Sequence, residues 1–167
     1  MKKILTFALL IMAVLAIATS AMAATGLGAV TSVSLTPATA DKAGSVSVNT
    51  IMCAVTLDEA GKIVAVKFDV VQPKAAFDAA GAASGELNAA PQTKKELKEG
   101  YGMKRVSSIG KEWYEQAAGF CAYVTGKTIA DVAGIAIVDG KVADADLAAT
   151  TTIGIADFQA LIEKAGK

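Results

Sequence analysis

The sequence contains no histidine and only two cysteines in 167 residues. Without histidine, the chain cannot form a Ser-His-Asp or Cys-His catalytic group, nor a metal site with imidazole ligands. The cysteines, Cys53 and Cys121, are too few and too widely spaced for a metal cluster or a CxxC redox motif. These absences exclude the commonest hydrolase and metalloenzyme chemistries.

An excess of charge of one sign is also lacking, because 16 basic residues balance 16 acidic ones. A near-neutral chain gives no support for nucleic-acid binding. Glycine-rich nucleotide-binding patterns and EF-hand loops are absent, and the carboxylates are scattered over expected turns and helix caps. The sequence therefore predicts no metal site and favours a role other than catalysis.

Long apolar runs are absent outside the first 23 residues. Two lysines precede an almost wholly apolar stretch over 4–18, and Ala21 and Ala23 provide the small residues that a signal peptidase requires. This pattern predicts a signal peptide over 1–23. An uncleaved anchor is the alternative, but the run is short for the roughly 20 residues that a membrane span needs. We expect a periplasmic, cell-surface or extracellular protein with no stable membrane span after cleavage.

Residues 24–167 suffice for a single domain with its own core. The segment Gly26–Leu35 is β-rich, and Ser45–Asp58 and Ile63–Val71 alternate between apolar and polar residues around a glycine-containing turn. We expect a β-meander, followed over 72–92 by a long irregular loop with one helical turn near Ala75–Ala80. The inward-facing residues are predicted to be Ile51, Cys53, Val55 and Leu57 on one strand, and Val64, Val66, Phe68 and Val70 on the next.

Helical patterns dominate the second half of the chain. The stretch Ser107–Thr128 holds the only tryptophan, and Trp113, Ala117, Phe120 and Val124 share one helix face. We therefore expect Trp113 to lie in the core. Cys121 is predicted on this helix and Cys53 on a strand. The cysteines could form a disulfide in an oxidising compartment, although two free, buried thiols are favoured.

Further elements complete an α+β fold in which helices partly cover an antiparallel sheet made of the meander and a later strand. Helix starts with capping-box spacing are expected at Thr93 and Thr128. The later strand is predicted over Ile135–Val138, and Thr150–Ile153 is β-like. A last helix is expected with Gly154 as its N-cap and with an apolar face of Ile155, Phe158, Leu161 and Ile162.

Three segments, taken in order, resemble the FMN-binding domain of exported bacterial flavoproteins. These are the hairpin VTLDEAGKIVAVKFDVV, the segment SSIGKEWYEQAAGF followed by a Gly-Lys pair, and the closing piece DADLAATTTIGIADFQALIEKA. In that family the closing piece carries a Ser-Gly-Ala-Thr motif whose threonine can be esterified to the phosphate of FMN. The resemblance implies a flavin or another anionic small molecule near Thr150, Thr151 and Thr152, held by helix-terminal amides.

The resemblance also implies that the Ile109-Gly110 turn lies near the flavin ring, with Trp113 or Tyr114 as an apolar wall. The serine and glycine of the motif are absent here, which argues against covalent attachment. Two functions follow as expectations. The first is a flavin-based electron relay at the cell surface with a redox partner. The alternative is a secreted binding or structural module of the same fold that has lost the flavin.

Overall fold

A computed structural model describes residues 22–84 and 90–167, and it has an α+β fold with one main antiparallel sheet. Strand β2 (Gly44–Asp58) lies at the centre of the sheet, with β1 (Met22–Thr36) along one edge. Along the other edge, β2 pairs first with β3 (Ile63–Val71) and then, nearer its start, with the short strand β4 (Lys74–Phe77). Residues 1–21 of the predicted signal peptide lie outside the described residues.

The hairpin formed by β2 and β3 confirms most of the predicted alternation. The predicted inward residues of β2 are all buried, as are Val66, Phe68 and Val70 of β3. Val64 was predicted to face inward but is 43% exposed, and Ile63 is buried in its place. The register between the strands shifts next to Leu57, so one extra residue bulges out and the side-chain alternation resets.

The predicted irregular loop over 72–92 is partly wrong. Residues Ala75–Phe77 belong to β4 rather than to a helical turn, and β4 pairs in turn with β5 (Ala83–Ser84). The reason lies in β2, which continues past the end of β3 and there exposes backbone groups that need partners. Residues 85–89 of the predicted loop lie outside the described residues.

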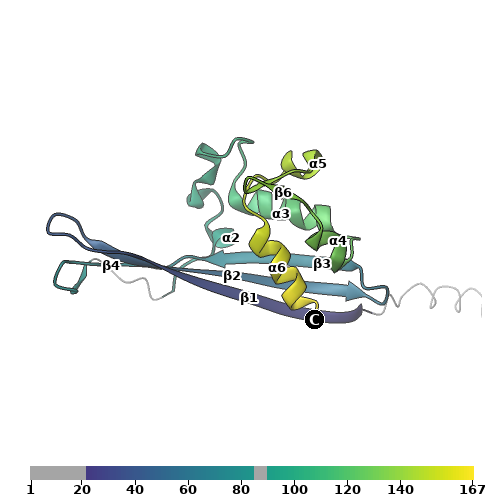
Figure 1. Ribbon diagram of the computed structural model, residues 1–167, viewed down its shortest axis with the longest axis horizontal. Coiled ribbons are helices and arrows are strands. Elements are labelled where there is room, and N and C mark those ends of the chain that lie inside the picture. The colour runs from purple at the N-terminus through teal and green to yellow at the C-terminus, as the bar shows by residue number, and fades with distance from the viewer. Residues whose placement is uncertain (1–21, 85–89) are drawn as a thin grey trace, which may run out of the picture.

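The helices gather over one face of the sheet, and the β1–β2 ribbon extends beyond them to where β4 pairs with it (Figure 1). The main helices are α3 (Trp113–Val124) and α6 (Ala156–Ala165). Helix α6 crosses β1 so closely that a Cβ atom on Gly26 would lie 1.6 Å from the carbonyl oxygen of Ala165. Glycine at this position therefore permits the helix to dock on the strand.

Shorter helical segments precede and follow α3. They are α2 (Lys94–Leu97), the 3-10 turns η1 (Lys98–Tyr101) and η2 (Met103–Arg105), α4 (Ile129–Ala133) and α5 (Ala145–Ala148). The capping boxes predicted at Thr93 and Thr128 are both present. After η1 the chain turns at Gly102, which has φ +75°.

Four aromatic side chains form the centre of the core. Phe68 of β3 stacks on Phe158 of α6 with ring centroids 4.2 Å apart, and Trp113 meets Phe158 edge-on at 6.2 Å. Phe120 of α3 completes the cluster and contacts the rings of Phe68 and Phe158. Trp113 is 3% exposed, which confirms its predicted place in the core. The predicted apolar faces of α3 and α6 are both buried.

The predictions for the C-terminal region need three corrections. The predicted later strand is β6 (Ile137–Val138), but it pairs with β7 (Lys141–Val142) in a separate hairpin and does not join the main sheet. Residues 150–153 form no strand. Ile155, rather than Gly154, is the N-cap of α6. Each of these β-like segments is so short that its local sequence does not determine which strand it pairs with. Tertiary contacts determine the pairing instead.

Candidate functional site

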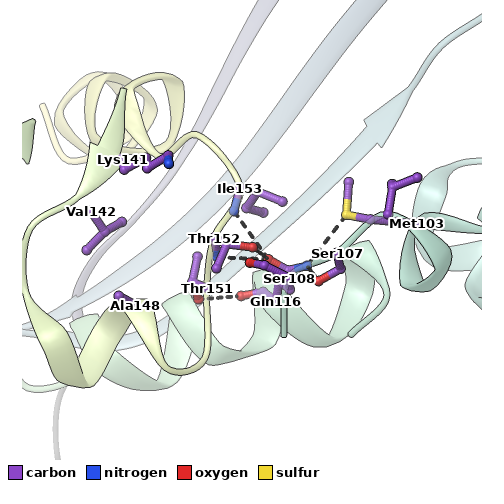
Figure 2. A pocket seen from close by; sticks show the side chains of 11 residues that line it. Met103, Ser107, Ser108, Gln116, Lys141, Val142, Ala148, Thr151, Thr152 and Ile153 are labelled. Atoms are coloured by element: carbon purple, nitrogen blue, oxygen red, sulfur yellow. Dashed lines mark hydrogen bonds between the residues drawn. The ribbon is translucent and has the colours of Figure 1, made fainter. Parts of the chain in front are cut away.

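The connection between α5 and α6 carries the three candidate threonines and is held by one buried side chain, Gln116 of α3. The Gln116 Oε1 atom accepts hydrogen bonds from Thr152 N at 2.8 Å, Thr152 Oγ1 at 3.0 Å and Ile153 N at 3.2 Å. The Thr151 hydroxyl donates to the Gln116 backbone carbonyl at 2.9 Å. This connection is therefore bound tightly to helix α3, as Figure 2 shows.

The opposite end of the Gln116 amide holds the loop that precedes α3. Its Nε2 atom donates to Ser107 Oγ at 3.1 Å and to the Lys111 carbonyl at 3.1 Å. Gln116 is fully buried, and all its amide atoms have partners. Gln116 thus binds both the loop before α3 and the connection between α5 and α6, and it fixes the distance between them.

A second buried polar residue, Glu112, organises the same loop. Its carboxylate accepts hydrogen bonds from Met103 N at 2.8 Å and Lys104 N at 3.1 Å. Glu112 is 3% exposed, so these backbone donors replace the water that its carboxylate loses on burial. Residues 103–112 are thus held in place by two side chains, that of Glu112 just before α3 and that of Gln116 within it.

Between the two segments lies a cavity of about 440 Å³, called here the threonine cavity. Its lining combines hydroxyl and apolar groups with one charged side chain, the ammonium of Lys141 (Figure 2). None of the described residues that line it carries a carboxylate. The residues around it are Met103, Val106, Ser107, Ser108, Gln116, Lys141, Val142, Ala148, Thr151, Thr152 and Ile153. This charge pattern suits a ligand with an anionic group.

A second cavity of about 310 Å³, called here the tryptophan cavity, shares Met103 and Ile153 with the first. Its lining mixes polar and apolar groups, and among the described residues it again carries one charged group, Lys94. The Lys94 ammonium lies 4.7 Å from the centre of the Tyr101 ring and 5.3 Å from that of Trp113. The residues around it are Asn49, Ile51, Val70, Gln72, Lys94, Met103, Trp113, Ile153, Gly154 and Phe158.

The structure separates the five predicted site residues. Thr151 and Thr152 line the threonine cavity, while Thr150 turns to donate to the Leu147 carbonyl at 3.1 Å. Ile109 and Gly110 line neither cavity, and Ser107 and Ser108 from the same loop take that place. The threonines were expected at the N-terminus of α6, but three residues separate Thr152 from the first helical residue.

Sequence reasoning missed Gln116 and Asn49 as site residues. One signal for Gln116 was available, because it falls between Trp113 and Ala117 on the apolar face of α3, where a polar side chain needs buried partners. Asn49 gave no comparable signal. It stands in a β-strand, where a single asparagine is equally common on the exposed face.

Neither cysteine provides a reactive thiolate. Both are free, and Cys53 is buried as predicted, whereas Cys121 is only half-buried, so that part of the prediction is wrong. Burial, with a smaller effect of Cys121, raises the pKa of the Cys53 thiol to about 12. Burial also raises the pKa of Cys121. The thiols therefore stay protonated at neutral pH and are poor nucleophiles.

Within 22–84 and 90–167, no group of three or more acidic, cysteine or histidine side chains is placed to hold a metal ion. No helix in these ranges is long and apolar enough to cross a membrane.

Comparison with known proteins gives one match of note. The chain is 38% identical over 98 residues to a protein of Desulfitobacterium hafniense named chlorophenol reductase. The match covers 52% of this chain but only 30% of that protein. No protein-family profile matches the chain, and no solved structure matches it.

Proposed function

We propose that this chain is an exported FMN-binding module that takes part in electron transfer outside the cytoplasm. The observation that carries the proposal is the pair of adjoining cavities at the threonine segment, each with one lysine and no carboxylate in its lining. Cavities of this size and mixed polarity are typical of small-ligand sites. The resemblance of the same segment to the FMN-attachment region adds to this support.

The residues present fit FMN in their chemistry. Lys141 offers a cation for the phosphate, and Ser107 and Ser108 offer hydroxyl groups for the ribityl chain and phosphate. The apolar side chains that line both cavities, Met103 and Ile153, suit a planar ring. Bound FMN would supply reversible one- and two-electron transfer. The chain's own residues would bind it, orient it and shield it from water.

Non-covalent binding is the form that the geometry favours. The hydroxyls of Thr151 and Thr152 are both engaged with Gln116, and the Thr150 hydroxyl donates to a helix carbonyl. Esterification of any of the three would remove a donor and leave its buried acceptor with fewer partners. The same hydrogen bonds fix the backbone that would border the phosphate.

The name of the relative from Desulfitobacterium hafniense supports a redox role, since a reductase transfers electrons. That protein is much longer than the matched segment, and this chain spans about a third of its length. A redox partner for this chain, and its export, belong to the proposal.

The visible absorption spectrum of protein purified from its native host tests the proposal. We expect flavin bands, and we expect the flavin to stay in solution when the protein is denatured and precipitated. Titration of the recombinant protein provides the matched comparison. FMN should bind more tightly than riboflavin, and Lys141→Met should reduce that difference. Absence of flavin in the native protein together with no FMN binding in vitro would refute the proposal.

A second candidate is a module of the same fold that has lost the flavin. The engagement of the threonine hydroxyls with Gln116 favours it, because the segment is held without any ligand. In that case the cavities bind neither FMN nor riboflavin, and the threonine–Gln116 contacts serve stability alone.

A further inference from the structure

The outer edge of β1 presents backbone groups that no other described strand pairs with. Residues 29–36 of this strand are all exposed, and they belong to the ribbon that extends beyond the helices (Figure 1). The strand has 15 residues, none of them charged and none a proline. Charged side chains and prolines are common means by which edge strands avoid pairing with another chain. The edge of β1 can therefore accept a further strand.

The hydrogen bonds around β1 show which of its residues direct their backbone groups to this edge. Val48 N donates to the Pro73 carbonyl at 3.0 Å, so its N–H points away from β1. Val48 lies opposite Val33, and this pair is therefore one that exchanges no backbone hydrogen bonds. Val33 directs its N–H and C=O outward, and because the register is continuous here, Thr31 and Leu35 do the same.

Hydrogen bonding along the open edge is limited at both ends. At one end, Lys164 Nζ donates to the Ala29 carbonyl at 2.7 Å, so α6 already covers that acceptor. At the other end, Pro37 follows β1 and has no N–H to donate. The open edge thus comprises residues 30–36, with Val33 at its centre.

We infer that β1 pairs antiparallel with β1 of a second copy of this chain, across a twofold axis at Val33. Val33 then lies opposite Val33 of the second copy, and Thr31 lies opposite Leu35. Each of these pairs exchanges both backbone hydrogen bonds. In the same register Ala29 falls opposite Pro37, so the residue without an N–H meets the carbonyl that Lys164 already occupies.

A second copy fits this edge because the strand is complementary to itself. Val33 and Leu35 are 66% and 64% exposed, and they lie opposite Val48 and Val46 of β2. Pairing places two such apolar strips side by side, and no like charges meet, since β1 carries none. The twofold arrangement also uses the open edge of both copies and so closes as a dimer. The contact is small, so we expect a dimer that dissociates on dilution.

Sedimentation equilibrium of the secreted chain over a series of concentrations tests the pairing. The wild-type protein should fit a monomer–dimer equilibrium. Val33→Lys places two like charges opposite each other at the axis and should weaken the dimer by about tenfold or more. Val64→Lys is the matched control, because Val64 is also an exposed valine, on β3, and this change should leave the dimer unchanged. Melting temperatures establish that both variants are folded.

Oxidative cross-linking tests the register. Val33→Cys should form a disulfide-linked dimer, because residues in a hydrogen-bonded pair have Cα atoms about 5.5 Å apart, which a disulfide can span. Thr31→Cys alone and Leu35→Cys alone should not cross-link, since each residue would lie about 14 Å from its own copy across the axis. An equal mixture of the two variants should cross-link. The wild-type chain, oxidised in parallel, controls for its half-buried Cys121.

Three results would overturn the pairing. They are a chain that stays monomeric at every concentration, equal dimer affinities of Val33→Lys and Val64→Lys, and cross-linking of Thr31→Cys alone with none in the mixture. A monomeric chain that instead retains another protein of its native host through this edge, and loses it in Val33→Lys, would assign the edge to a different partner and would also overturn it. FMN binding plays no part in these measurements.

Discussion

Two side-chain amides, one beside each cavity, differ sharply in their surroundings: Gln116 is fully buried and Asn49 is half-buried. Gln116 has a partner for each of its amide atoms and joins the loop before α3 to the threonine segment. The Oδ1 atom of Asn49 has no hydrogen-bond partner in the described structure. The difference teaches that one amide stabilises the fold, whereas the other leaves a buried acceptor unpaired. Substitutions should therefore lower stability at Gln116 and change it little at Asn49.

The largest effect is expected at the shared aromatic core that supports both amides. Trp113→Ala should lower the free energy of unfolding by about 3 to 5 kcal/mol, because a large buried aromatic is removed and a cavity remains. Urea denaturation followed by circular dichroism measures this change. An unchanged denaturation midpoint would mean that Trp113 does not anchor the region.

The next largest effect is expected at Gln116 itself. Gln116→Leu should cost about 2 to 3 kcal/mol, because the backbone N–H groups of Thr152 and Ile153 lose their acceptor. Gln116→Glu keeps one acceptor oxygen but places the other against the Lys111 carbonyl and buries a carboxyl group, so it should cost at least as much. The same denaturation experiment checks both variants, and a neutral effect of Gln116→Leu would remove the basis of the comparison.

Cys53 extends the comparison to a buried group that can ionise. Its raised folded-state pKa, to about 12, means that the unfolded chain releases the thiol proton first as the pH rises. Stability should therefore be unaffected by Cys53 below pH about 9 and should fall between about 9 and 12, by about 1.4 kcal/mol per pH unit at most. Subtracting the pH profile of Cys53→Ala isolates this contribution. Parallel profiles of the two proteins would show that the thiol pKa is ordinary.

The smallest effect on stability is expected at Asn49. Asn49→Leu should change the free energy of unfolding by no more than about 0.5 kcal/mol, or should stabilise the protein, since it removes an unpaired acceptor. Thermal unfolding checks this without ligand. A loss of several degrees in melting temperature would show that Asn49 has a structural role like that of Gln116.

The features predicted correctly from the sequence are those fixed by local periodicity. The apolar faces around Trp113 and Phe158 and the capping boxes at Thr93 and Thr128 depend on residues only a few positions apart. Two features depend instead on contacts between strands that are distant in the sequence. These are the bulge that exposes Val64 and the pairing of β4 with β2, and no local sequence pattern predicts either.

The candidate site was predictable only in part for the same reason. A family resemblance directed attention to Thr151 and Thr152, which do line a cavity. Their main partner, Gln116, is 35 to 37 residues away in the sequence. Asn49 comes from β2, in the first third of the chain. Contacts of this range follow from tertiary packing and cannot be inferred from spacing.

The central claim is that the two cavities together hold one FMN, and an FMN titration of a variant at a residue that lines both tests it most directly. Ile153 lines both cavities, so Ile153→Trp should reduce the space in each of them. The wild-type protein should bind FMN with one-to-one stoichiometry, measured by flavin fluorescence, and the folded Ile153→Trp variant should bind at least tenfold more weakly. No FMN binding by the wild-type protein, or equal binding by the two proteins, would contradict the account.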